Sequence, residues 1–177
     1  LIGAVDRNVG KTAFACEIIK LHSALRPVIA LKITVIKEKD GMCPRGGRGC
    51  GVCTSLSGNF KITEEFNACS QKDTSKMLSA GAAKVFWLRV MEEYMEEGVK
   101  VLLDIVGKSI SSDPSFIFEA DHKGRLPYIC ESNSIRKVIN PGLFVIFKRT
   151  NDNYIKPSCG EVIEFADKII NFDSKSF

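Results

Sequence analysis

The residues near the start of the chain best suited to chemistry are Gly10-Lys11-Thr12, which follow an apolar run at 1–5 and open a helical pattern. Backbone N–H groups of such a turn bind phosphate oxygens, while the lysine reaches the β and γ phosphates and the threonine hydroxyl binds Mg²⁺. The motif therefore predicts a loop that binds GTP or ATP together with Mg²⁺. The residues expected to bind this cofactor are Asn8, Val9, Gly10, Lys11, Thr12 and Ala13.

This loop departs from the full phosphate-binding pattern at one position. The first glycine of G-x-x-x-x-G-K-[ST] corresponds here to Val5. A Gly-Lys-Thr tripeptide arises by chance in about one chain in ten of this length, but its place between a predicted strand and a predicted helix favours phosphate binding. Asp6 stands where deviant ATPase loops carry an extra lysine, which disfavours that class.

Carboxylates at the ends of neighbouring strands are the usual partners of Mg²⁺ beside such a loop. Glu131 closes the apolar run at 128–130, so we expect it to hold Mg²⁺ or its bound water and, with Lys11, to be catalytic; a surface carboxylate is the alternative. Asp40 is a second candidate ligand of Mg²⁺, although an aspartate before a glycine is also typical of a turn. Asp73 is expected to contact phosphate or Mg²⁺, with a helix N-cap as an equal alternative.

A glycine-rich segment carries three cysteines at C-x6-C-x2-C spacing, namely Cys43, Cys50 and Cys53. Two thiolates at C-x2-C spacing can bind one ion, and Cys69 could complete a tetrahedral site. The open interpretations are zinc, an iron–sulfur cluster, and free or redox-active thiols. A metal centre would order the 38–59 loop, whose six glycines make ordering costly.

The elements that position these residues alternate between strands and helices. Apolar runs predict strands at 1–5, 28–37, 84–90, 128–130, 143–147 and 169–170, and helical spacing or caps predict helices at 11–25, 72–80, 91–107 and 158–168. This alternation predicts the α/β class, with a mainly parallel central sheet in the three-layer fold of P-loop NTPases. We expect residues 1–177 to form one nucleotide-binding domain with a Cys/Gly-rich inserted loop at 38–59.

Four further stretches, in chain order, carry family-like motifs: Ile36-Lys37, Lys72-Asp73-Thr74-Ser75 with Ala80-Gly81-Ala82, Tyr128-Ile129-Cys130-Glu131, and Val145-Ile146-Phe147-Lys148-Arg149. Together with the phosphate loop, they resemble the MobB family of molybdopterin-guanine dinucleotide biosynthesis adapter proteins over roughly residues 1–150. The resemblance implies a P-loop protein that binds GTP, usually as a homodimer. It also implies a nucleotidyltransferase or molybdoenzyme partner in molybdenum-cofactor maturation, and it makes Lys37 and Asp73 cofactor-binding residues.

The chain departs from that family at three places. Glu38-Lys39-Asp40 stands where the family has histidines, and Ser132 replaces a glycine after the strand-end glutamate. The cysteine-rich stretch at 43–53 is an insertion. These departures indicate a divergent subfamily.

The composition favours a globular protein with a core, because 45% of the 177 residues are apolar and 26% are charged. No apolar run approaches the roughly 18 residues of a membrane span. The net charge of +4 suits phosphate-bearing ligands and is too small to predict nucleic-acid binding. We therefore expect neither a membrane nor a nucleic acid as partner. Seven unevenly placed cysteines favour a reducing, cytoplasmic location over a disulfide scaffold.

Three functions remain open from the sequence. The first is a nucleotide-binding accessory protein that hydrolyses GTP slowly, which would make it at most a weak NTPase. The second is a small-molecule kinase or ligase that uses the same loop and Mg²⁺. The third is a metal- or redox-sensing module regulated by nucleotide. The choice of GTP over ATP depends on the resemblance alone, because the guanine-reading motif Asn-Lys-x-Asp is absent.

Overall fold

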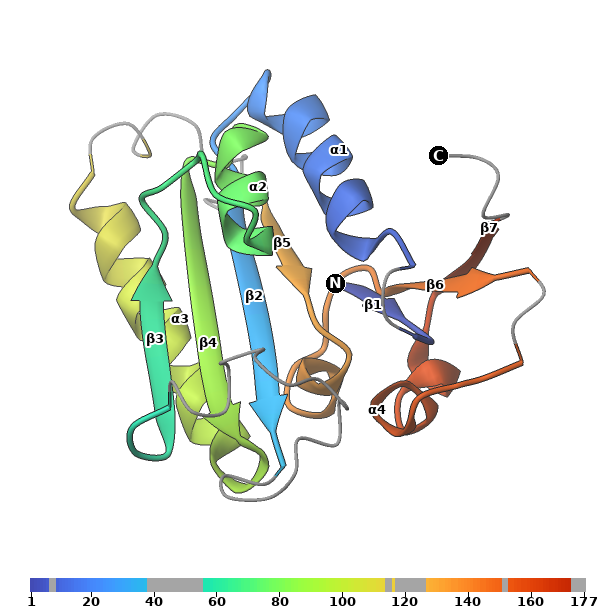
Figure 1. The fold of residues 1–177 in the computed structure, drawn as a ribbon. Coiled ribbons are helices and arrows are strands. Elements are labelled where there is room, and N and C mark those ends of the chain that lie inside the picture. Colours follow the sequence, from blue (N-terminus) through green and yellow to red (C-terminus); the bar gives the residue numbers. More distant parts are fainter. Residues whose placement is uncertain (7–8, 38–55, 114–115, 117–126, 151–152, 173–177) are drawn as a thin grey trace.

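The computed structural model describes the chain except for residues 7–8, 38–55, 114–115, 117–126, 151–152 and 173–177. Asn8, Asp40, Cys43, Cys50 and Cys53 therefore lie outside the described residues. The described strands form one seven-stranded sheet in the order β3-β4-β2-β5-β1-β6-β7 (Figure 1). Neighbouring strands are parallel except for the pair β3 and β4, which is antiparallel. The predicted α/β class with a mainly parallel sheet is confirmed.

The strands are β1 (Ile2–Ala4), β2 (Ile29–Ile36), β3 (Phe60–Glu64), β4 (Lys84–Met91), β5 (Tyr128–Glu131), β6 (Val145–Arg149) and β7 (Lys168–Phe172). The α-helices are α1 (Lys11–Ser23), α2 (Asp73–Ser79), α3 (Met95–Ser111) and α4 (Pro157–Gly160). Three short 3₁₀ helices complete the described elements: η1 (Glu92–Tyr94), η3 (Ser134–Lys137) and η4 (Ile163–Phe165).

Helices cover both faces of the sheet, and each face has its own apolar core. On one face, Ile19 of α1 and Met77 of α2 pack on Ala30 of β2 and its neighbours. On the other face, Leu102 of α3 packs among residues such as Phe86. The two cores explain why β2 reads as a nearly continuous apolar run, since a central parallel strand is buried on both sides. Figure 1 shows α1 and α2 in front of the sheet and α3 behind it.

Two predictions of local structure are wrong. The helix predicted at 158–168 is instead the four-residue α4 followed by η4, because Val162 leaves the helical conformation at φ −137° and Ala166 is extended. The strand β3 was not predicted at all. It is an edge strand whose side chains are mostly half-buried, so it lacks the apolar run that marks a central strand.

None of the described helices combines the length and the apolar character that a membrane crossing requires.

Candidate functional site

Gly10 stands at the junction between β1 and α1, directly before the first turn of the helix. Gly10 has φ +80°, a conformation that residues with a side chain rarely adopt. It precedes α1, and its carbonyl accepts the Phe14 N–H at 2.9 Å. Within the described part of the chain no side chain caps α1, so its first-turn N–H groups have no side-chain acceptor there. These N–H groups, together with the positive end of the helix dipole, are suited to bind a phosphate.

Lys11 is the first residue of α1. Its Nζ donates a hydrogen bond of 3.1 Å to the backbone carbonyl of Asp6. Burial lowers the pKa of Lys11, and the nearby Glu131 carboxylate partly opposes that effect. Of the other residues predicted in the loop, Val9 is buried and Ala13 is exposed. Lys11 therefore lies at the helix start with its Nζ bound to a carbonyl of the preceding loop.

Thr12 contacts a residue far along the chain. Its hydroxyl donates a 2.8 Å hydrogen bond to Oε2 of Glu131, which ends β5 and is only 6% exposed. The contact follows from the strand order, because β5 lies directly between β1 and β2. The structure thus brings together two residues that the sequence had singled out separately.

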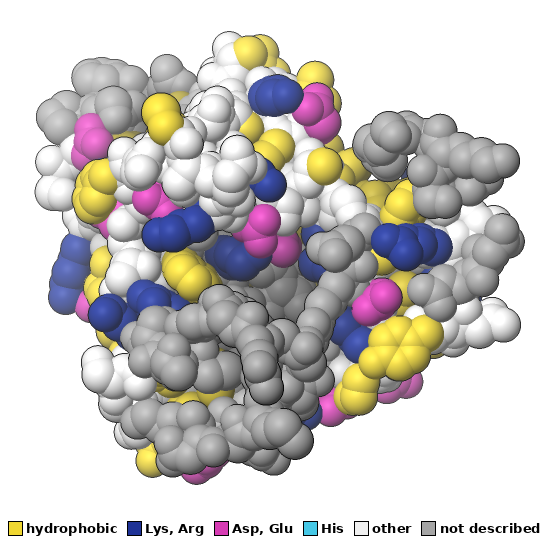
Figure 2. Space-filling model, viewed as in Figure 1, with side chains coloured by type: hydrophobic (Ala, Val, Ile, Leu, Met, Phe, Trp, Pro, Cys, Tyr) yellow, Lys and Arg dark blue, Asp and Glu magenta, His cyan; other side chains and the backbone are white. Residues whose placement is uncertain are grey.

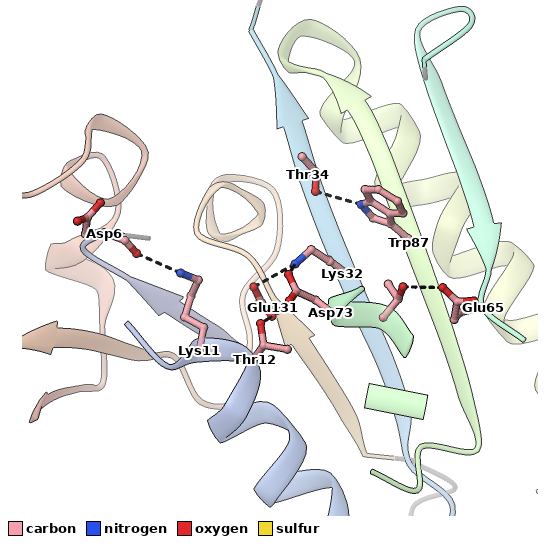
Figure 3. A network of polar contacts seen from close by, with 10 residues as sticks. Asp6, Lys11, Thr12, Lys32, Thr34, Glu65, Asp73, Trp87 and Glu131 are labelled. Carbon is pink, nitrogen blue, oxygen red and sulfur yellow. Dashed lines mark hydrogen bonds and ion pairs between the residues drawn. The ribbon is translucent and has the colours of Figure 1, made fainter. Parts of the chain in front are cut away.

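Lys32, which the sequence analysis missed, lies beside this pair. It is on β2 in register with Glu131, and its Nζ is 3.3 Å from Oε1 of that carboxylate. The same ammonium forms a hydrogen-bonded ion pair with Asp73. Burial opposes the charge on Lys32, but the two carboxylates outweigh burial and raise its pKa. Figure 3 shows Lys32 between Glu131 and Asp73.

Asp73 is the first residue of α2, and Lys72 occupies the N-cap position without a capping side chain. The alternative interpretation of Asp73 as a helix N-cap is therefore wrong. Burial raises the pKa of Asp73, but the interactions with Lys32 outweigh burial and the net shift is downward; a hydrogen bond with Thr12 adds to it. We refer to Thr12, Lys32, Asp73 and Glu131 as the four-residue cluster. Four elements supply one residue each: α1, β2, α2 and β5.

The four-residue cluster contains the donor atoms that Mg²⁺ prefers. Two carboxylates and one hydroxyl supply hard oxygen ligands, which suit this ion better than nitrogen or sulfur. The Lys32 ammonium already neutralises part of the negative charge there. Its position beside the helix start would also let it pair with a bound phosphate.

Other predicted residues lie elsewhere. Lys37 follows β2 and pairs with Glu92 at 3.4 Å and with Glu161 at 3.6 Å. It is five residues beyond Lys32, which corresponds to about 16 Å along a strand. Cys69 is exposed, and among the residues that the structure describes no group of three His, Cys, Asp or Glu side chains could hold a metal. The structure does not bring these residues to the four-residue cluster.

The sequence does contain a signal for Lys32. It is the single charged residue in the run at 28–36, whose other residues are apolar except for Thr34. Buried lysines are rare unless they are paired, so a lysine in a central strand indicates a carboxylate or an anionic ligand nearby. The motif resemblance instead implies that Lys37, which follows the same strand, binds the cofactor.

Asn133 fixes the end of β1 relative to the four-residue cluster. Its side-chain amide donates to the Ala4 carbonyl and accepts from the Ala4 N–H, each at 2.9 Å. Gly3 makes this approach possible, because a Cβ there would lie 2.8 Å from Asn133 Oδ1 and 3.0 Å from the ring of Phe144. Asn133 thus continues the pairing of β1 after β5 has ended at Glu131.

Comparison with known proteins adds no relative, since the chain matches no family model, no curated protein and no solved structure. Any functional conclusion therefore depends on the residues and their geometry, together with the motif resemblance.

Proposed function

We propose that this protein binds a nucleoside triphosphate with Mg²⁺ at the junction of β1 and α1. The observation that carries the proposal is the hydrogen bond from Thr12 to Glu131 within the four-residue cluster, directly beside Lys11. A phosphate-binding motif without a carboxylate nearby would give little support for binding of a nucleotide with Mg²⁺. Here the threonine of the motif contacts a buried strand-end carboxylate, which is the pairing that a Mg²⁺ site beside a phosphate loop requires.

The phosphates would be bound by three kinds of donor. The first-turn N–H groups of α1 would donate hydrogen bonds to the phosphate oxygens nearest the helix, and Lys11 would pair with the β and γ phosphates. Lys32 would approach the terminal phosphate from the β2 side. The Lys32 side chain is 17% exposed, so it remains partly accessible despite its two carboxylate partners.

The oxygen atoms of Thr12, Asp73 and Glu131 would hold the metal ion. When bound, Mg²⁺ supplies positive charge that offsets the phosphate oxygens. The proposed role of Glu131 is to orient a water molecule through its carboxylate, and that of Asp73 is to hold Lys32 in place. Slow hydrolysis is the activity that this set of residues supports.

We further propose GTP as the nucleotide and molybdenum-cofactor maturation as the setting. The support is the resemblance to the MobB family, with its implied homodimer and nucleotidyltransferase or molybdoenzyme partner. The contacts around Thr12 and Glu131 support a nucleotide site. The choice of base and the partner are supported by the motif resemblance.

Titration calorimetry with Mg-GTP and Mg-ATP tests the binding step. We expect Lys11→Ala to lower triphosphate affinity at least tenfold while the circular dichroism spectrum is unchanged. The matched control is Lys20→Ala, which removes an exposed lysine of the same helix that pairs with the nearby exposed Glu17. Equal affinities for the wild-type and Lys11→Ala proteins would contradict the proposal, as would an equal loss in the Lys20→Ala control.

A further inference from the structure

On the face of the sheet that carries the four-residue cluster, the residues change from apolar to polar along the strands. Under α1 and α2 the aligned residues are apolar: Ala30, Val85 and Ile129. Two residues further along, the aligned row is polar or aromatic and runs across four strands: Glu131, Lys32, Trp87 and Thr63. The row after that consists of Thr34, Arg89 and Lys61. Directly opposite residues of neighbouring strands share a face, so the last two rows form one continuous polar surface.

Trp87 and Arg89 are held in place by contacts within these rows. The indole Nε1 of Trp87 donates a 3.0 Å hydrogen bond to the hydroxyl of Thr34. The guanidinium of Arg89 lies 4.4 Å from the centroid of the Trp87 ring and donates to the Thr63 hydroxyl at 3.4 Å. Figure 3 shows the bond between Trp87 and Thr34 beside Lys32. The guanidinium is therefore fixed in orientation before any ligand binds.

Arg89 is unusual because it is only 6% exposed. Burial lowers its pKa, although the guanidinium remains charged at any physiological pH. Its cross-strand neighbour Lys61 is exposed, and Trp87 is half-buried, so the edge of this surface is accessible to solvent. A fixed guanidinium with an exposed lysine beside it is suited to carboxylates and phosphates, which arginine binds through two parallel hydrogen bonds.

This surface lies close to the proposed nucleotide site. Arg89 is one strand over and two residues along from Lys32, which corresponds to about 8 Å between Cα positions. Figure 2 shows Lys and Arg side chains gathered over β2, β3 and β4, on the face where α1 and α2 lie. An anion bound by Arg89 would therefore be near the terminal phosphate of a bound nucleotide.

We propose that Arg89, Lys61 and Trp87 form a binding subsite for a second ligand, a small molecule that carries a phosphate or a carboxylate group. Its place beside a nucleotide rests on the proposed function, whereas the binding of the anion itself does not. The subsite adds an acidic small molecule to the nucleotide as a second ligand of this protein.

Trp87 provides a direct readout, because it is the only tryptophan of the chain. Its emission is measured while inorganic phosphate, or succinate in a second series, is added at constant ionic strength. The titrations are made in a Lys11→Ala background, which removes the proposed nucleotide site from the measurement. Phosphate and succinate distinguish a phosphate ligand from a carboxylate ligand.

We expect a saturable change in emission with at least one of the two probes in the Lys11→Ala protein. Lys61→Gln should raise the probe concentration at the midpoint about threefold to tenfold. Arg89→Gln should abolish the change in emission. The exposed Lys61 keeps the test decisive if the buried Arg89 variant does not fold. The control Lys100→Gln removes an exposed charge from α3, on the opposite face of the sheet, and should not shift the midpoint.

Two outcomes would overturn the proposal. One is the absence of any saturable change with either probe, and the other is an equal midpoint for Lys61→Gln and its parent. Failure of the nucleotide site is recognised separately. In that case wild-type protein would bind no triphosphate in calorimetry, while the tryptophan titration with inorganic phosphate or succinate would be unaffected.

Discussion

The hydroxyl of Thr12 donates a 2.8 Å hydrogen bond to the carboxylate of Glu131, a residue 119 positions further along the chain. The bond joins the first turn of α1 to the end of β5. It exists because β5 is inserted between β1 and β2 in the sheet. The proposed Mg²⁺ site depends on this junction.

Glu131→Gln should preserve nucleotide binding and lower hydrolysis about a hundredfold, the usual scale for a residue that positions water or transfers a proton. Glutamine is similar in size and can still accept a hydrogen bond from Thr12, so the fold should persist. Single-turnover GTP hydrolysis and calorimetry measure the two effects separately. Glu97→Gln, an exposed residue of α3, is the control. Unchanged turnover in Glu131→Gln would leave that carboxylate with a structural role only.

Lys32→Met should change two affinities in opposite directions. Without the ammonium, Asp73 and Glu131 lose their shared cation, so the nucleotide-free protein should bind Mn²⁺ or Mg²⁺ more tightly. Triphosphate affinity should fall at least tenfold, since a charge-assisted contact is lost. Electron paramagnetic resonance of Mn²⁺ and nucleotide calorimetry provide the two readouts. The control Lys37→Met should alter neither affinity, because Lys37 pairs with Glu92 and Glu161 instead.

Asp73→Asn should make the free energy of unfolding less dependent on pH in the acidic range. The pKa of Asp73 in the folded protein is below its ordinary value of 3.8, so the stabilising charge is present above that value and is lost as the pH falls through the folded-state pKa. At pH 7 the variant should lose about 1 kcal/mol of unfolding free energy, a small amount because the side chain is 40% exposed.

Urea unfolding at neutral pH and below pH 3.8 measures this difference, which should shrink at the lower pH. Asp104→Asn breaks an exposed i,i+4 pair with Lys108 and should cost less than about 0.5 kcal/mol. A difference between wild type and Asp73→Asn that grows on acidification would contradict the assignment.

Asn133→Ala should destabilise the fold by about 2–4 kcal/mol, because it removes both hydrogen bonds to the buried backbone of Ala4. Gly3→Ala should have a similar effect for a different reason, since the new methyl group would collide with Asn133 and Phe144. Denaturant unfolding measures both. Asn140→Ala, at an exposed position, should stay within about 0.5 kcal/mol of wild type.

Native protein should contain about one equivalent of zinc or iron if Cys43, Cys50 and Cys53 bind a metal, and chelation should make these thiols reactive. Cys130 should stay unreactive under native conditions, because burial raises its pKa to about 12. Elemental analysis and alkylation followed by mass spectrometry measure the two properties. Less than about a tenth of an equivalent of zinc or iron, with those three thiols freely alkylated, would end the metal hypothesis.

Several features of the fold could be predicted from the sequence because they depend on neighbouring residues. The apolar run of β1 and the helical spacing after Lys11 are local signals, and the structure has a strand and a helix at these places. The strand-end position of Glu131 follows from a short apolar run in the same way. Local propensity and periodicity act over a few residues, so one sequence is enough to detect them.

That Lys32 rather than Lys37 joins the four-residue cluster is decided by the tertiary structure. Both lysines belong to or follow β2, but they are an odd number of residues apart and would point to opposite faces of a strand. Only the register of β2 against β5 aligns Lys32 with Glu131, and only the place of α2 brings in Asp73. That register is set by packing between segments far apart in the chain, which no local pattern encodes.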